Sequence, residues 1–173
     1  MGDVAEPSFD PRRILLELVD GQVDFVVVGG VAVQAHGHGR STRDLDVLPN
    51  PGLLNLSRLG ETLGRLDARL VRSQEPVNVT DPQLLKRVPL VPLMTAYGRL
   101  DLLNVEHTAG GLAYEDLRAR AVPVQIDGRT IPVAALDDLI RMKRAAGRLV
   151  DRDDIGALTR SDEELQREAG EST

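Results

Sequence analysis

The stretch FVVVGGVAVQAHGHGRSTRDLD, residues 25–46, decides the fold of this chain. Its β-branched run at 25–28 predicts a buried strand, because such side chains favour extended backbone and are bounded here by a break. Gly29-Gly30 supplies that break, and residues 31–35 predict the beginning of a helix. A glycine-rich segment then leads into a second strand at 45–48, so the stretch predicts a strand–turn–helix–strand unit.

Outside this unit, apolar spacing predicts further helices and strands in alternation. Helices are expected at 11–20, where Pro11 suits a first helical position and Gly21 ends the pattern, and at 53–66, around Leu84 and Leu85, at 136–147 and at 151–158. Strands are expected at 68–71, 90–95, 100–105, 122–126 and 130–133, the last two joined by the hairpin signal Asp127-Gly128-Arg129. The pattern predicts an α/β (α+β) chain with C-terminal helices.

Length and composition narrow the class of protein. The chain has 173 residues with 42% hydrophobic and 28% charged, which predicts one domain over 1–160 followed by a polar, disordered tail over 161–173. The absence of cysteine excludes thiolate nucleophiles and sulfur ligands for zinc. The first ten residues are unlike a secretory signal, and the longest uncharged stretch is too short to span a membrane, so we expect a cytoplasmic protein.

Charge and aromatic content limit the partners. A formal net charge of −6 argues against a protein that coats nucleic acid through bulk electrostatics, although a local basic site stays possible. Two phenylalanines and two tyrosines are too few for a platform of several stacked bases.

Asp44-Leu45-Asp46 is the first candidate for chemistry. Residues two apart on a strand point to the same face, so both carboxylates are expected side by side while Leu45 enters the core. Two like charges at that separation indicate either a site for a divalent cation or a solvated edge of the sheet. This motif alone does not decide between the two.

Asp101 is a carboxylate inside the apolar run Leu100 to Leu103, where an unpaired charge would be costly. If its strand lies beside the strand of Asp44 and Asp46, three carboxylates converge on one spot, as is needed to hold two Mg²⁺ ions and a triphosphate. Alternatively, Arg99 points to the same face and pairs with Asp101 for a structural reason.

Gly29-Gly30 adds a candidate phosphate contact. Glycines between a strand and a helix allow backbone N–H groups to approach a phosphate, and the helix dipole assists. Arg40, Thr42 and Arg43 precede Asp44 and are further candidates for contacts to phosphate oxygens. His36 and His38 flank Gly37 and could approach substrate, but we interpret them as residues of a polar loop. His107 follows the strand of Asp101, and no nucleophile is identified to pair with it.

Together, Gly29-Gly30, Asp44-Leu45-Asp46 and Asp101 resemble the signature of the nucleotidyltransferase superfamily. Residues 28–33, with Gly37, Arg40, Thr42, Arg43 and Asp44, are similar to the AbiEii-like and MenT-like toxins of bacterial toxin–antitoxin systems. Lys143, Arg148, Asp151 and Asp154 resemble the lysine, arginine and aspartate motif of that family. The resemblance covers about residues 14–158 and implies the nucleotidyltransferase fold, a mixed central sheet flanked by helices.

The resemblance also implies roles. Asp44, Asp46 and Asp101 would be catalytic and bind two Mg²⁺ ions, while Lys143 and Arg148 would hold the phosphates of an NTP and Asp151 would position Lys143. The implied reaction transfers a nucleoside monophosphate to a hydroxyl with release of pyrophosphate. The implied acceptor is the 3′ end of tRNA, and the implied partner is a cognate antitoxin.

Other interpretations stay open. The same chemistry can act on a protein side chain or a small molecule, and low basicity favours that alternative. A non-catalytic nucleotide-binding protein or antitoxin with this fold is a third possibility. Lys143 to Asp154 also fits an exposed helix with salt bridges. The sequence departs from many superfamily members at Gly30, where they have serine and therefore a hydroxyl.

Overall fold

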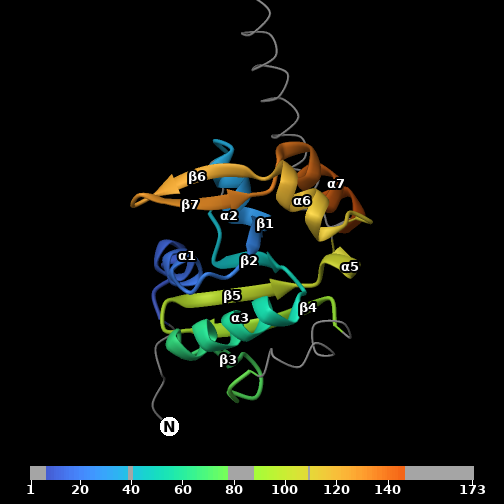
Figure 1. The fold of residues 1–173 in the computed structure, drawn as a ribbon. Helices are drawn as coiled ribbons and strands as arrows, with labels where there is room; N and C mark the ends of the chain where they lie inside the picture. The colour runs from blue at the N-terminus through green and yellow to red at the C-terminus, as the bar shows by residue number, and fades with distance from the viewer. Residues whose placement is uncertain (1–6, 39–40, 78–87, 109, 147–173) are drawn as a thin grey trace, which may run out of the picture.

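The computed structural model describes residues 7–38, 41–77, 88–108 and 110–146. These ranges contain seven strands in one mixed sheet, with helices between them (Figure 1). The helices are α1 Pro11–Asp20, α2 Gly29–Ala35, α3 Leu53–Arg65, α5 Val105–Thr108, α6 Tyr114–Arg120 and α7 Leu136–Ala146. The strands are β1 Phe25–Val28, β2 Asp44–Pro49, β3 Arg69–Leu70, β4 Leu90–Thr95, β5 Gly98–Leu103, β6 Val122–Ile126 and β7 Arg129–Val133.

Strand order across the sheet is β3-β4-β5-β2-β1-β7-β6. β2 lies at the centre, antiparallel to β1 and parallel to β5, and β1 is parallel to β7. The two hairpins, β4–β5 and β6–β7, form the outer parts of the sheet. This mixed arrangement confirms the fold class predicted from the sequence, and it confirms that the strand of Asp101 lies beside that of Asp44 and Asp46.

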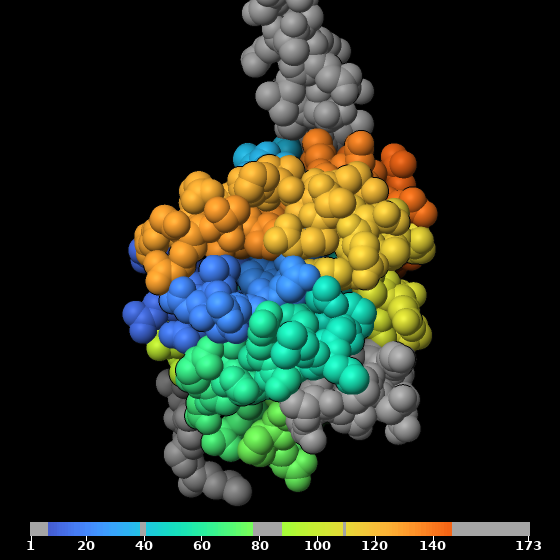
Figure 2. Space-filling view, viewed as in Figure 1, coloured from blue at the N-terminus to red at the C-terminus, as the bar shows by residue number. Residues whose placement is uncertain are grey.

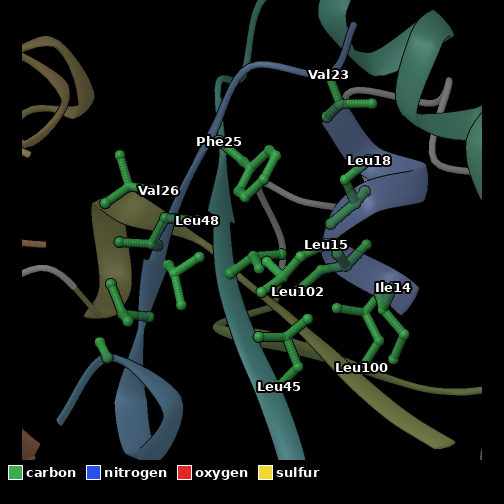
Figure 3. Packing of buried hydrophobic residues seen from close by; sticks show 14 of the residues in the cluster. Ile14, Leu15, Leu18, Val23, Phe25, Val26, Leu45, Leu48, Leu100 and Leu102 are labelled. Carbon is green, nitrogen blue, oxygen red and sulfur yellow. The ribbon is translucent and has the colours of Figure 1, made fainter. Parts of the chain in front are cut away.

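One face of the sheet is covered by aliphatic packing. Figure 3 shows Phe25 directed between β2 and α1, near Leu18, with Leu45, Leu100 and Leu102 on the same side. Phe25 and these three leucines are at most 1% exposed, so the central strands bury this face almost completely. Burial of each such side chain contributes about 1.5–3 kcal/mol.

Helices α1 and α3 lie over that face. Figure 1 shows α3 in front of β4 and β5 and α1 at the left, above β5, and Figure 2 shows the two helices adjacent on the surface turned to the viewer. The α3 helix buries Leu56, Leu59 and Leu63 at helical spacing, whereas Leu53 and Leu54 at its beginning are 68% and 69% exposed. Because α1 and α3 cover this face, the polar side chains of β2 and β5 are carried by the opposite face.

Two local differences from the sequence prediction have physical causes. The strand expected over 100–105 ends at Leu103, because the Asn104 side chain accepts a hydrogen bond from the Glu106 amide at 2.9 Å and begins α5. The helix expected from residue 31 begins at Gly29 instead, since Gly29 adopts a φ of +64° that turns the chain directly out of β1.

Two short helices, α5 and α6, were not predicted. The α6 helix has only seven residues and buries only Tyr114 and Leu117, which is too little periodicity to distinguish it from a loop. The helices expected around Leu84 and Leu85 and at 151–158, the end of the helix at 147, and the tail at 161–173 lie outside the described residues. Among the described residues, no helix is both long enough and apolar enough to cross a membrane.

The α7 helix is attached to α6 by a forked ion pair. Arg120 donates from Nε and Nη2 to the two oxygens of Asp138 at 3.0 and 2.9 Å, and Asp138 is 5% exposed. Farther along, Arg141 Nε donates to the carbonyl of Gly110 at 2.9 Å. These contacts set the position of α7, which carries one wall of the pocket described below.

We expect Arg120→Ala to destabilise the fold by about 1–3 kcal/mol, because it leaves the buried Asp138 carboxylate unpaired. Arg118→Ala is the matched control. Arg118 lies on the same helix with a similarly exposed side chain, 48% against 47%, but its partner Asp24 is 38% exposed rather than buried. Its loss should cost less than about 1 kcal/mol. Equal midpoints for both variants in urea unfolding would contradict this ranking.

Candidate active site

The parallel pairing of β2 with β5 brings four charged residues onto one face of the sheet. Asp44 is opposite Arg99, and Asp46 is opposite Asp101. Because strand side chains alternate, all four point away from the face that holds Leu45, Leu100 and Leu102. The three carboxylates that the sequence singled out therefore meet on one surface together with one guanidinium.

Arg99 and Asp101 form a forked ion pair. Arg99 Nε and Nη2 donate to the two oxygens of Asp101 at 2.9 and 3.1 Å. The Asp101 residue is 4% exposed, and its burial raises the pKa of the carboxyl, which the Arg99 guanidinium lowers and the charge of Asp44 raises further. Both arrangements that the sequence suggested are therefore present. Arg99 pairs with Asp101, and Asp101 shares one face of the sheet with Asp44 and Asp46.

Gly29 lies directly against Asp46. A Cβ atom built on Gly29 would be 2.0 Å from Asp46 Oδ2, so no side chain fits at this position. The backbone also has a φ of +64°, which L side chains rarely adopt. The glycine predicted as a phosphate contact is thus also required for the placement of a carboxylate.

Thr42 connects the loop before β2 to the same cluster. Its hydroxyl lies 3.0 Å from Asp44 Oδ1 and 3.2 Å from the Asp44 carbonyl oxygen. A Cβ atom on Gly30 would be 2.7 Å from the same hydroxyl oxygen. The Thr42 side chain therefore occupies the space that a side chain at residue 30 would need.

A pocket of about 400 Å³ opens over the carboxylates. Its base is formed by Gly29, Asp44, Asp46, Arg99 and Asp101. One wall is on α7, with Leu139, Met142, Lys143, Ala145 and Ala146, and the other combines Leu90 and Leu103 with His107 and Thr108 of α5. The enclosure combines a charged base with largely aliphatic walls, so it is suited to a ligand that has both a charged part and an apolar part.

Lys143 brings a positive charge to this pocket. It is 7% exposed and lies among residues lining the cavity, with Met142 beside it in the buried part of α7. A cation there and the guanidinium of Arg99 partly offset the three carboxylates. The interpretation of residue 143 as part of an exposed, solvated helix face is therefore wrong.

The structure brings together five of the residues that were singled out: Gly29, Asp44, Asp46, Asp101 and Lys143 all line the pocket. Gly30, Thr42 and Arg43 do not line it, and Arg43 is exposed at the entrance to β2. Arg40, Arg148 and Asp151, together with Asp154, lie outside the described residues.

His107, Thr108 and the aliphatic wall were not identified as site residues from the sequence. No role was assigned to His107 from the sequence because no nucleophile pairs with it, but α5 places it on the pocket. The available signal was its position shortly after the strand that carries Asp101. The apolar pattern of residues 100–105 concealed this signal, because it predicted that the strand continues beyond Leu103.

The donor atoms of this site fit a divalent cation such as Mg²⁺. Asp44 and Asp46 present carboxylate oxygens side by side, and such oxygens are the ligands that Mg²⁺ prefers. Within the described ranges, no three acidic or histidine side chains are placed to hold one ion together. Asp101 faces Arg99, so Asp44 and Asp46 are the two carboxylates of this face that Arg99 does not fork.

Comparison with known sequences finds one family. The family model described as "Nucleotidyltransferase of unknown function (DUF6036)" matches residues 13–163. No curated protein sequence is similar enough to count as a match.

Solved structures that resemble this chain include the two that follow. The crystal structure of the lincosamide antibiotic adenylyltransferase LnuA, bound to lincomycin, superposes with a TM-score of 0.59 at 15% identity, covering 88% of this chain and 98% of that one. The solution structure of the antibiotic-resistance factor ANT(2'')-Ia gives a TM-score of 0.47 at 15% identity, covering 94% and 96%. The first of these likenesses confirms the nucleotidyltransferase fold.

We expect Gly29→Ala to weaken the binding of Mn²⁺, used as a probe for Mg²⁺, by about 10–100-fold, because the new methyl group displaces Asp46. Gly37→Ala is the matched control. Gly37 also has a positive φ, +88°, but no atom lies within 4 Å of the position that its new methyl group would take. It should lose about 1–2 kcal/mol of stability without a change in affinity. Mn²⁺ titration followed by electron paramagnetic resonance measures the affinity of both variants. Equal affinities would refute the inference that Gly29 is required for the placement of Asp46.

Proposed function

The chain belongs to the nucleotidyltransferase family, and from this premise we propose that it transfers a nucleoside monophosphate from an NTP to an acceptor hydroxyl. One observation carries the proposal: Asp44, Asp46 and Asp101 share one face of β2 and β5 and line a single pocket. Phosphoryl transfer depends mostly on positioning and on charge stabilisation, and this pocket supplies groups for both.

In the proposed mechanism, Asp44 and Asp46 would hold divalent cations, two of them by similarity to the superfamily. Bound cations would supply positive charge that neutralises and orients the triphosphate. Asp101 completes the set on the acceptor side and takes the proton of the attacking hydroxyl. The acceptor oxygen forms a bond to the α-phosphorus while the bond from that phosphorus to the bridging oxygen breaks, and pyrophosphate leaves.

The remaining polar groups would bind the nucleotide. The Gly29 amide at the beginning of α2 lies at the base of the pocket and the Lys143 ammonium lies on the α7 wall, and we assign both to the phosphates. Gly30, Thr42 and Arg43 would act from the edge of the site. Arg40, Arg148 and Asp151 are proposed for the same task on the sequence resemblance alone.

The acceptor that we propose first is the 3′ end of tRNA, with the protein acting in the cytoplasm as the toxin of a toxin–antitoxin pair. Support comes from the similarity of residues 28–44 to AbiEii-like and MenT-like toxins. Modification of that end would prevent aminoacylation and arrest growth, and a cognate antitoxin would be the partner that restrains it.

A small molecule with a free hydroxyl is the second candidate acceptor. The specific observation in its favour is the aliphatic lining formed by Leu90, Leu103, Leu139 and Met142, which shares the pocket with the carboxylates. The formal net charge of −6 also disfavours a large polyanionic acceptor.

The proposal is tested by incubating the purified protein with each α-labelled NTP and Mg²⁺, with total tRNA or a panel of hydroxyl-bearing antibiotics as acceptor. We expect pyrophosphate release and a labelled acceptor, and at least a ~100-fold loss of both in Asp46→Asn because a ligand charge is removed. Asp67→Asn is the matched control, since Asp67 is an exposed aspartate at the edge of the same sheet, paired with Arg69.

Each outcome selects one interpretation. Label on RNA supports the tRNA acceptor, and label on a small molecule replaces it with the second candidate. Binding of NTP without pyrophosphate release, whatever acceptor is added, would refute the enzyme and favour a nucleotide-binding antitoxin.

A further inference from the structure

The fork of Arg99 occupies both oxygens of Asp101, the third carboxylate of the site. The two donors lie 2.9 and 3.1 Å from the two oxygens, so the guanidinium and the carboxylate meet edge to edge. A divalent cation that used Asp101 as a ligand would have to approach the same oxygens. Two positive charges at that distance repel each other, particularly where Asp101 is shielded from water.

We propose that Arg99 is a built-in counterion that a divalent cation displaces from Asp101 when the site is loaded. The inference rests on the proposed function, because it concerns the cation that this function needs. It assigns Arg99 two positions: against Asp101 in the metal-free protein, and turned into the pocket when metal and nucleotide are bound.

The surroundings of Arg99 permit both positions. Its side chain is 41% exposed, whereas that of Asp101 is 6% exposed, so the guanidinium is the partner that can move. Arg99 lines the pocket and lies opposite Asp44 across the strand pair. Once released from Asp101, the guanidinium would remain in the pocket. The phosphate oxygens of the incoming nucleotide would then replace the carboxylate oxygens of Asp101 as its hydrogen-bond acceptors.

The metal-free protein gains from this arrangement. Without a cation, Asp44, Asp46 and Asp101 would place three negative charges on neighbouring positions of one sheet face. Arg99 neutralises the most buried of the three and leaves the two more accessible carboxylates to receive the first ion. The site is therefore kept assembled before any ligand binds.

The test is a double-mutant cycle on Mn²⁺ affinity in the nucleotide-free protein, measured by electron paramagnetic resonance. Arg99→Gln should bind Mn²⁺ about tenfold more tightly than the wild type, a change of about 1.4 kcal/mol. In an Asp101→Asn background the same substitution should change the affinity less than about twofold, because the competition has been removed. Arg69→Gln, on β3 and paired with Asp67, is the control for general loss of charge and should have no effect.

The cycle separates competition from a long-range charge effect. An equal gain in affinity in both backgrounds would overturn the proposal, since it would show that Arg99 acts on the ion through space alone. No gain, or weaker binding in Arg99→Gln, would also overturn it. Absence of Mn²⁺ binding in the wild type and in every variant would instead refute the cation site itself, and with it the proposed function.

A second measurement guards against a variant that folds poorly. In the metal-free state Arg99→Gln should have a lower thermal midpoint than the wild type, and saturating Mn²⁺ should abolish that difference, because the ion then replaces the lost charge. Arg99→Lys keeps the charge but loses the fork, and it should have an intermediate Mn²⁺ affinity. A thermal deficit that Mn²⁺ leaves unchanged would show that Arg99 is only structural.

Discussion

Parallel pairing of β2 with β5 is the constraint on which the rest of the site depends. It sets Asp44 opposite Arg99 and Asp46 opposite Asp101, and alternation then sends Leu45 and Leu100 to the other face. One shift of register would bury the acids and expose the leucines. The aliphatic core under α1 and α3 therefore does more than stabilise the sheet, because its packing is what holds the carboxylates on one face.

Most of the sheet and the base of the pocket could be predicted from the sequence because their patterns are local. The β-branched run of β1, the Asp44-Leu45-Asp46 alternation and the lone Asp101 each report the face on which a residue lies. The side walls could not be predicted in the same way. His107 reaches the pocket only because Asn104 ends β5 early, and α6, which positions α7 through Arg120, is too short to have a clear period.

Lys143 shows how a resemblance and a local pattern can disagree. Composition alone favoured an exposed helix with salt bridges over residues 143–154, whereas the resemblance implied a phosphate ligand at Lys143. Burial argues against the solvated face, since Lys143 is 7% exposed and lines the pocket with Met142. The forked pair of Arg120 with Asp138 and the bond from Arg141 to Gly110 fix the helix in that orientation. Such long-range contacts leave no trace in the spacing of residues 136–146.

The contact between Gly30 and Thr42 has a consequence for how this sequence can change during evolution. The two positions share one volume, in which the hydroxyl of Thr42 supports Asp44. A serine at 30 would need a smaller residue at 42, and a glycine at 30 leaves room for threonine. We therefore expect the two positions to change together, because the volume that they share beside the carboxylates accommodates only one side chain.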